Sequence, residues 1–327
     1  MRPLLKWAGG KRQLLPRLRR HYPARFDRYL EPFLGSGAVF FDLFSSGLLE
    51  GRRVLLADAN PDLIGCYRAV RDDPDGVIAA LSALEKEHRR RGSACYYEVR
   101  DERFNPSRPA EGAYTPALAA MFIYLNRTGY NGLFRLTRRG GFNVPAGRYA
   151  DPRICDAAHV RAVGRALASR GVSLDCVMFD EVMSDTYAGD FVYCDPPYVP
   201  MSRTANFANY TAGGFGPADQ QRLQKALVGA AARGVFVLAS NSGAITAEAA
   251  YTLPAARLAG LAVERVPARR AINSRAALRG PIDELVITNV AIGGQLRQRP
   301  RPAMLHAATA DRLPLRRTHT AARSRPR

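Results

Sequence analysis

Short apolar runs, each closed by glycine, proline or an acid, recur along this chain of 327 residues and constrain its fold more than any other feature. They are rich in Val, Leu, Ile and Phe, which is typical of strands buried on both faces. Helical patterns separate several of them, including one over residues 219–234 with 3.6-residue spacing and a glycine stop. Strands that alternate with helices predict an α/β fold with a largely parallel sheet. The predicted strands cover residues 28–33, 53–58, 172–179, 190–195, 234–240 and 282–289.

The alternation breaks between residues 71 and 155. Helical patterns cover residues 73–92 and 115–130, and a basic, glycine-rich segment follows them. That segment predicts a β-hairpin with its turn at Gly140 and Gly141. We therefore expect two domains and a tail. The main domain would comprise residues 1–70 and 156–294, the inserted, mainly helical domain residues 71–155, and the basic disordered tail residues 295–327.

A formal net charge of +19 distinguishes the composition. The tail contributes +8, from nine arginines and one aspartate, and residues 1–294 still carry +11. Polyanions, nucleic acid first, are the natural partners of such a field. An arginine-favouring genome is the alternative explanation, because only four of the 48 basic residues are lysine.

Other classes of protein fit the chain poorly. No apolar stretch reaches the roughly 18 residues that span a bilayer, and the N-terminus lacks the apolar region of a signal peptide. The five cysteines are scattered without CxxC pairs, which argues against a disulfide framework and a zinc site. We therefore expect a cytoplasmic protein without a metal ion.

A glycine turn follows the first predicted strand, in "EPFLGSGAVF". Gly35 and Gly37 let the backbone approach a ligand closely, and Asp58 ends the next strand, where an acid reaches ribose hydroxyls. Phe40 stands where a third glycine would favour a pyrophosphate, so a phosphate-free nucleoside such as S-adenosylmethionine fits better than a dinucleotide. A purely structural turn is the alternative. Nearby, Trp7 in "KWAGGK" is either a core residue or a wall of the same site.

The stretch "DFVYCDPPY" ends another strand at residues 190–198. Ligands bind at the carboxyl ends of strands in open α/β sheets, and two prolines stiffen the chain there. Asp195 and the Pro196 carbonyl can accept the two hydrogens of a planar amine while Tyr198 stacks on its ring. This geometry weakens conjugation of the nitrogen lone pair and favours its attack. The alternative is a simple turn with an aromatic plug.

These stretches resemble the Dam-like DNA adenine-N6 methyltransferases from Pro3 to Asn289. The shared motifs include "LKWAGGK", "EPFLGSGAVF", "NRTGYNGLFR", "FNVPAGRY", "GDFVYCDPPY" and "RRAINSRAALRGPIDELVITN", in the family's order. The resemblance implies a Rossmann-like methyltransferase sheet with an inserted, mainly helical target-recognition domain that carries a β-hairpin. The tail matches nothing in the family.

The resemblance also implies roles for individual residues. The S-adenosylmethionine site would be lined by Trp7, Lys11, Gly35, Asp58 and Asp195, while Asp195, Pro196 and Tyr198 would hold the target adenine. The base must leave the duplex, so Tyr130 would fill the gap with Asn131 beside it. Arg135 and Lys6 would read guanines, Leu133 and Pro145 would pack on neighbouring bases, and Arg275 and Arg279 would lie near phosphates.

The sequence therefore predicts methyl transfer to N6 of a flipped adenine in double-stranded DNA, within GATC, without metal or covalent intermediate. The host would be bacterial or phage, and no obligate protein partner is evident. Three alternatives stay open: a different target site in a restriction-modification system or prophage, methylation of cytosine N4, RNA or a protein amide, and an inactive DNA-binding module.

Overall fold

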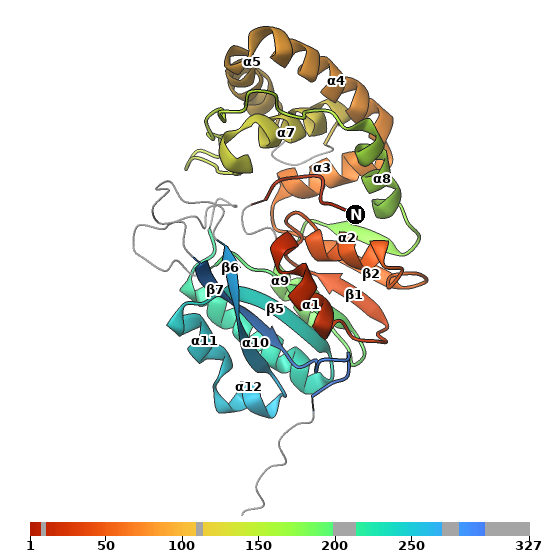
Figure 1. Ribbon diagram of the computed structural model, residues 1–327, viewed down its shortest axis with the longest axis vertical. Helices are drawn as coiled ribbons and strands as arrows, with labels where there is room; N and C mark the ends of the chain where they lie inside the picture. Colours follow the sequence, from red (N-terminus) through yellow and green to blue (C-terminus); the bar gives the residue numbers. More distant parts are fainter. Residues whose placement is uncertain (8–10, 109–113, 199–213, 270–280, 298–327) are drawn as a thin grey trace, which may run out of the picture.

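The computed structural model describes residues 1–7, 11–108, 114–198, 214–269 and 281–297. A seven-stranded sheet in the order β3-β2-β1-β4-β5-β7-β6 forms the centre of this part of the chain (Figure 1). The first five strands in that order are parallel, and β7 is antiparallel to both of its neighbours. The strands are β1 (Arg28–Glu31), β2 (Arg53–Ala57), β3 (Val172–Asp175), β4 (Phe191–Cys194), β5 (Phe236–Ser242), β6 (Ala262–Arg269) and β7 (Pro281–Thr288).

Six strands lie within or close to the predicted ranges, which confirms the α/β class. The predicted strand over 172–179 is too long, because β3 ends at Asp175 and a helix starts at Phe179. Strand β6 was not predicted. Its sequence "AVERVPAR" mixes charges with Pro267, a pattern that an edge strand tolerates because it pairs on one side only, here with β7.

Helices cover both faces of the sheet. Tyr29 and Tyr193 face one core, and Leu30 and Val192 face the other, as the alternation of side chains along a strand requires. The second core includes side chains of α9, α10, α11 and α12. The helices are α1 (Leu15–Leu18), α2 (Ala38–Ser45), α3 (Pro61–Asp72), α4 (Pro74–Arg91), α5 (Ser93–Glu98), α6 (Asn105–Ser107), α7 (Pro116–Thr128), α8 (Ala157–Leu167), α9 (Phe179–Ser184), α10 (Pro217–Arg233), α11 (Ile245–Tyr251) and α12 (Pro254–Leu258). A π-helical stretch, Val99–Phe104, joins α5 to α6.

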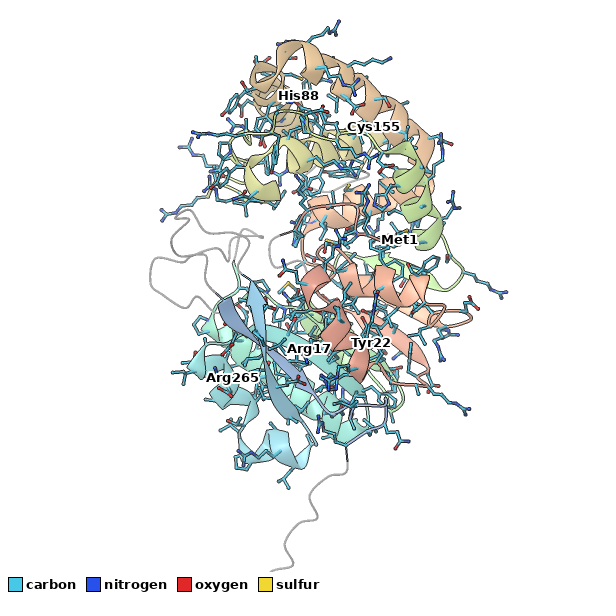
Figure 2. All side chains as sticks on the ribbon, viewed as in Figure 1. Met1, Arg17, Tyr22, His88, Cys155 and Arg265 are labelled. Atoms are coloured by element: carbon cyan, nitrogen blue, oxygen red, sulfur yellow. The ribbon has the colours of Figure 1, made fainter. Side chains whose placement is uncertain are left out.

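The inserted part is mainly helical, as predicted, and lies above the sheet in Figure 1. Its buried side chains, such as Leu81 of α4 and Ile123 of α7, belong to the same hydrophobic cluster as Tyr67 of α3. His88 of α4, labelled in the upper part of Figure 2, hydrogen-bonds the Tyr124 hydroxyl of α7 at 2.8 Å. The inserted helices therefore share one continuous core with the sheet.

The predicted hairpin in this part is only partly regular. Its turn is closed by a hydrogen bond from Thr137 N to Gly141 O (2.8 Å), but Leu136 and Phe142 form an isolated bridge and no strand. The Asn105 side chain hydrogen-bonds both backbone groups of Phe142: Phe142 N donates to Oδ1 at 2.8 Å, and Nδ2 donates to Phe142 O at 3.0 Å. Asn105 thus supports a short antiparallel pairing, and the predicted hairpin with its turn at Gly140 and Gly141 is present without a regular ladder.

The chain after β7 stays attached to the sheet up to the last described residue. Arg297 N donates to Asn289 O (2.7 Å) and Ala24 N to Gly294 O (3.3 Å). Residues 295–297 thus belong to the fold, although we expected the tail to begin at residue 295. Residues 298–327 of the predicted tail lie outside the described residues.

A buried ion pair ties the inserted part to the sheet domain. Arg108, which follows α6, donates to both carboxylate oxygens of Asp62 on α3, at 2.9 and 2.6 Å. The two side chains are only 16% and 5% exposed.

Replacing Arg108 by alanine should lower the free energy of unfolding by about 3–5 kcal/mol, because it leaves the buried Asp62 carboxylate uncompensated. The matched control is Arg161→Ala, which breaks an exposed pair with Asp75 and should cost less than about 1 kcal/mol. Urea unfolding of both variants measures the difference. Equal losses would show that the Arg108 pair contributes no more than a surface pair.

Candidate active site

Three acids meet at the carboxyl edge of the sheet. Glu31 ends β1, while Asp58 and Asp195 directly follow β2 and β4. These three strands are parallel neighbours in the order β2-β1-β4, so the acids lie at one edge. Side chains at such an edge are the ones that a ligand meets in open α/β sheets.

Asp195 is held by a buried cation. The Lys11 ammonium, whose side chain is 3% exposed, lies 2.9 Å from Asp195 Oδ1, and the Ser240 hydroxyl donates to the same oxygen at 2.9 Å. Burial raises the pKa of the Asp195 carboxyl, while Lys11 opposes this shift. Both contacts converge on Oδ1. A carboxylate has about four acceptor positions, so Asp195 has capacity for a further donor.

Tyr198 is fixed beside this pair. Its hydroxyl donates to Glu284 Oε2 at 2.8 Å, and the Lys11 ammonium lies 4.4 Å from the centroid of its ring. The preceding Pro197 carbonyl accepts a hydrogen bond from Gln220 of α10 at 2.9 Å. These contacts thus hold Pro197 and Tyr198 in place.

Asp58 and Gly35 shape the neighbouring turn. The Asp58 carboxylate accepts hydrogen bonds from Gly35 N and Asn60 N, both at 3.0 Å, and burial raises its pKa to about 6. Gly35 has a φ of +47°, and a Cβ there would lie 2.9 Å from Trp7 Cδ1. Trp7 therefore rests directly on the glycine turn, where only glycine fits.

Trp7 also joins this turn to the inserted part of the chain. Its ring stacks on Phe134, with centroids 5.9 Å apart and an interplanar angle of 21°. The adjacent Lys6 exchanges two backbone hydrogen bonds with the Asn126 side chain of α7, at 2.8 and 2.7 Å. The N-terminal segment thus connects the carboxyl edge of the sheet with the segment predicted to bind DNA.

The structure brings together several residues of that predicted DNA-binding set. Tyr130 is 40% exposed, and its N–H donates to Pro145 O at 2.9 Å. Asn131 has a φ of +54°, the left-handed conformation that asparagine adopts more readily than most residues. Arg135 is exposed, and its Nε donates to Asn143 Oδ1 at 2.8 Å.

The remaining members of the set are placed less fully. Leu133 packs partly buried against the main core, and Lys6 Nζ donates to Arg127 O at 3.3 Å and lies 4.3 Å from the Tyr149 ring centroid. Arg275 and Arg279 lie outside the described residues.

Sequence reasoning missed several polar residues at this edge. Glu31, Ser240 and Glu284 contact the site or its neighbours, yet none was assigned a role. A signal was present for Glu284, because an acid that alternates with the apolar Val286 on one face of a strand needs a partner. Ser240 gave no such signal, since a serine in a buried strand is common.

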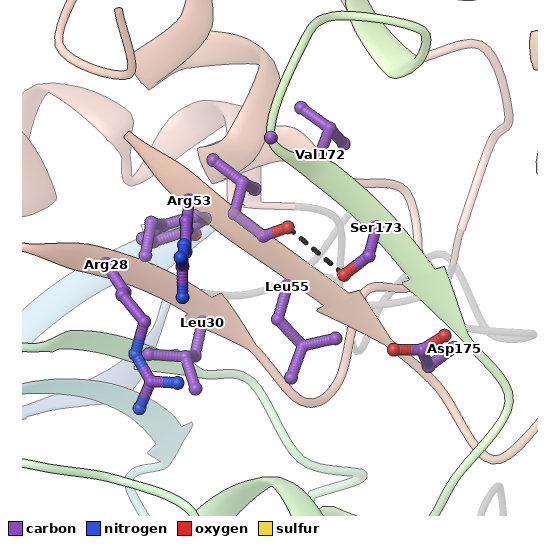
Figure 3. Close-up of a pocket in the computed structure, with 10 residues that line it drawn as sticks. Arg28, Leu30, Arg53, Leu55, Val172, Ser173 and Asp175 are labelled. Atoms are coloured by element: carbon purple, nitrogen blue, oxygen red, sulfur yellow. Dashed lines mark hydrogen bonds between the residues drawn. The ribbon is translucent and has the colours of Figure 1, made fainter. Parts of the chain in front are cut away.

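A cavity of about 470 Å³ lies on the sheet away from this site (Figure 3). Its lining comes from β1, β2 and β3, with Arg28 and Arg53 at the start of two strands. Leu30 and Leu55 also line it, and Leu30 faces the second core. The lining of the cavity does not include Asp58 or Asp195.

A metal-binding cluster and a membrane-spanning helix are both absent from the described ranges. No group of three or more His, Cys, Asp or Glu side chains in these ranges is arranged to hold a metal ion. None of the described helices combines the length and the apolar character needed to cross a membrane.

Comparison with known proteins identifies the family. A family model described as "D12 class N6 adenine-specific DNA methyltransferase" matches residues 7–263, well over half of the chain. The chain belongs to this family. As a D12-class enzyme it is an adenine-specific DNA methyltransferase, and its family implies S-adenosylmethionine as the methyl donor.

This D12-class enzyme matches its relatives over nearly their whole length. It is 34% identical to the type II methyltransferase M1.LlaDCHI of Lactococcus lactis subsp. cremoris (88% of this chain, 95% of the relative). It is 36% identical to the type II methyltransferase M.MjaIII of Methanocaldococcus jannaschii (88% and 99%) and 35% identical to a DNA adenine methylase of Vibrio cholerae serotype O1 (87% and 95%).

One solved structure gives a weaker likeness. The rRNA methyltransferase aviRa from Streptomyces viridochromogenes is 15% identical over 84% of this chain and 82% of its own, with a TM-score of 0.33. A score this low supports no further conclusion.

Glu31 makes the stability of the D12-class enzyme depend on pH. Its side chain is buried, and Oε2 accepts hydrogen bonds from the Tyr29 hydroxyl (2.7 Å) and Phe40 N (3.1 Å). Burial, together with the charges of Asp195 and Asp58, raises the pKa of Glu31 to about 8. Between these two values the folded protein keeps a proton on Glu31 that the unfolded chain has lost. The free energy of unfolding therefore falls as the pH rises from about 4.5, the pKa in the unfolded chain, to about 8.

The variant Glu31→Gln should therefore be as stable as the wild type near pH 4.5 and more stable at pH 8, by at least about 1 kcal/mol. One glutamine oxygen can still accept both hydrogen bonds. Urea unfolding at several pH values measures the gap. A gap that stays constant with pH would contradict the assignment.

Proposed function

We propose that this D12-class enzyme transfers the methyl group to N6 of an adenine that has been flipped out of double-stranded DNA, within the sequence GATC. The observation that carries the proposal is the Lys11–Asp195–Tyr198 cluster at the carboxyl edge of the sheet. Family membership supplies the adenine specificity and the DNA substrate. Base flipping, the double strand, the target sequence and the role of each residue belong to the proposal.

The cofactor-binding residues are Trp7, Lys11, Gly35, Asp58 and Asp195. These residues fit S-adenosylmethionine, a cation that carries a ribose. Carboxylates line the edge and can attract the positive charge, and the Gly35 turn, where no side chain fits, lets a ligand approach the backbone closely. Each Asp58 oxygen accepts one backbone hydrogen bond and has capacity for another, as a ribose hydroxyl requires. S-adenosylmethionine, when bound, supplies a methyl group on a positively charged sulfur.

The target amine is held by Asp195 and the Pro196 carbonyl, with Tyr198 stacked on the ring. Lys11 and Ser240 occupy Oδ1 of Asp195, so Oδ2 accepts one amine hydrogen and the carbonyl accepts the other. This geometry leaves the nitrogen lone pair free to attack. Positioning and electrostatics supply most of the catalysis.

The DNA-binding residues lie in the N-terminal and inserted segments. An adenine inside a duplex is out of reach, so Tyr130, which is exposed, fills the gap that the flipped base leaves, with Asn131 beside it. Arg135 and Lys6 read guanines, while Leu133 and Pro145 pack on neighbouring bases. Asn143 orients Arg135 by accepting from Nε at 2.8 Å and from Nη2 at 3.4 Å, and the remaining N–H groups of the guanidinium can donate to guanine O6 and N7. Arg275 and Arg279 complete the set near phosphates.

Residues 71–155 act in this proposal as the target-recognition domain, and residues 1–70 with 156–294 as the catalytic domain. A different recognition sequence is the second candidate, because the relatives include two type II methyltransferases as well as a DNA adenine methylase. An inactive DNA-binding module is the third, which the intact Asp195–Tyr198 motif disfavours.

Replacing Asp195 by alanine should abolish methyl transfer, with at least about a 100-fold loss, while DNA binding persists. The change removes an acceptor of the reacting amine and no phosphate contact. The matched control is Asp175→Ala, since Asp175 ends β3, the outermost parallel strand of the same sheet, and is half exposed. Transfer of labelled methyl groups and a DNA gel shift measure the two properties. Substantial turnover by the Asp195 variant would contradict the proposed mechanism.

The wild type should methylate the adenine of GATC on both strands, because that site is palindromic. Plasmid treated with the enzyme should resist a nuclease that cuts only unmethylated GATC. Complete cutting, despite methyl groups incorporated elsewhere, would exclude this target sequence and leave the second candidate.

Within that site, Arg135→Ala should relax discrimination at one G·C pair by about 1–3 kcal/mol and leave cofactor binding unchanged. Competition between GATC and single-base variants measures this loss. Arg139→Ala serves as the control, since Arg139 is an exposed arginine at the nearby turn with no assigned base contact. If both variants discriminate alike, Arg135 does not read a base.

A further inference from the structure

Glu284 contacts two members of the proposed site without belonging to it. Its carboxylate accepts the Tyr198 hydroxyl at 2.8 Å and lies 3.8 Å from the Lys11 ammonium. Lys11 in turn contacts Asp195 at 2.9 Å and the Tyr198 ring at 4.4 Å. Glu284 is therefore linked both to the stacking ring and to the cation that holds the amine acceptor.

The backbone of Glu284 is held firmly. It lies in β7, which pairs with β5 on one side and β6 on the other, so that Glu284 stands opposite Ser242 and Val266. Its side chain is 22% exposed and shares a face with Val286, which is fully buried. A carboxylate in such a position costs free energy unless it is paired and hydrogen-bonded. Here both its partners belong to the proposed site.

Tyr198 needs such a support. Its ring is useful for stacking only in one orientation, and an error of about 1 Å in a reacting group lowers rates by about 100-fold. A hydrogen bond from a hydroxyl to a charged acceptor is stronger and more directional than one to a neutral acceptor. Glu284 fixes the far end of the ring, and the Gln220 contact to Pro197 fixes the backbone before it.

We propose that Glu284 is a positioning residue for methyl transfer: through the Tyr198 hydroxyl it sets the orientation of the ring that stacks on the target adenine. Its charge beside Lys11 also helps to keep the ammonium between Asp195 and Tyr198. This inference rests on the proposed function, because it assumes that Tyr198 stacks on a flipped base.

The adjacent residue of the same strand offers a matched control. Asp283 points to the other face of β7, is half exposed, and contacts Arg265 at 3.5 Å. The variant Asp283→Ala thus removes a carboxylate from the same strand without touching the site. Arg265 lies on the β6 edge, away from the inserted helices (Figure 2).

The test compares Glu284→Ala, Glu284→Gln and Asp283→Ala with the wild type on duplex DNA that the wild type methylates. The single-turnover rate should fall by about 10- to 100-fold for Glu284→Ala and stay within about twofold for Asp283→Ala. Glu284→Gln keeps an acceptor for the hydroxyl and should recover most of the rate. If the alanine variant fails to fold, Tyr198→Phe, which removes the donor of the same hydrogen bond, should show the loss of rate instead.

A fluorescent base reports on the ring directly. With 2-aminopurine in place of the target adenine, an aromatic ring stacked on the flipped base quenches its emission. Bound Glu284→Ala should therefore show brighter emission than wild type, and Asp283→Ala the wild-type emission. The double variant Glu284→Ala/Tyr198→Phe should be no slower than the slower single variant, because the two changes break the same hydrogen bond.

Normal rates and normal emission in Glu284→Ala, or in Tyr198→Phe where alanine is not tolerated, would overturn the inference. So would a loss of rate with unchanged emission or with additive effects in the double variant. A wild type that transfers no methyl group to DNA would instead overturn the proposed function, so the two failures are distinguishable.

Discussion

The ion pair between Lys11 and Asp195 is the interaction on which the site depends. A nearly fully buried ammonium is costly unless carboxylates compensate it, and here Asp195 and Glu284 flank it at 2.9 and 3.8 Å. These three residues come from the N-terminal segment, the end of β4 and the antiparallel strand β7. The carboxyl edge is therefore assembled from distant parts of the chain, and removing Lys11 would leave two carboxylates without the cation that they share.

The same N-terminal segment connects the proposed active site with the segment proposed to bind DNA. Trp7 packs on the Gly35 turn and on Phe134, and Lys6 is bonded through its backbone to Asn126 of α7. The inserted helices share one hydrophobic core with the sheet, and the buried Arg108–Asp62 pair adds a second connection. Packed side chains thus join the segment proposed to bind DNA to the residues beside Lys11.

Much of this architecture is evident from the sequence. Strands that are buried on both faces have continuous apolar runs, so β1, β2, β4 and β5 are predictable, as is the acid at the end of β4. Strand β6 is not, because an edge strand with Pro267 and alternating charges lacks that pattern. Contacts such as those of Ser240 with Asp195 and of Glu284 with Tyr198 join residues 45 and 86 positions apart, and no local pattern encodes such a distance. The hairpin was predicted, but its support by the Asn105 side chain was not, because Asn105 lies 37 positions before Phe142.

The central claim is that Asp195, Pro196 and Tyr198 present the amine of an adenine in duplex DNA to a methyl donor. Its most direct test is to incubate the purified protein with isotope-labelled S-adenosylmethionine and unmethylated duplex DNA, digest the product to nucleosides, and identify the labelled nucleoside by mass spectrometry. The account predicts that the label is found in N6-methyldeoxyadenosine. Label in N4-methyldeoxycytidine, or none in DNA while the cofactor binds, would contradict it.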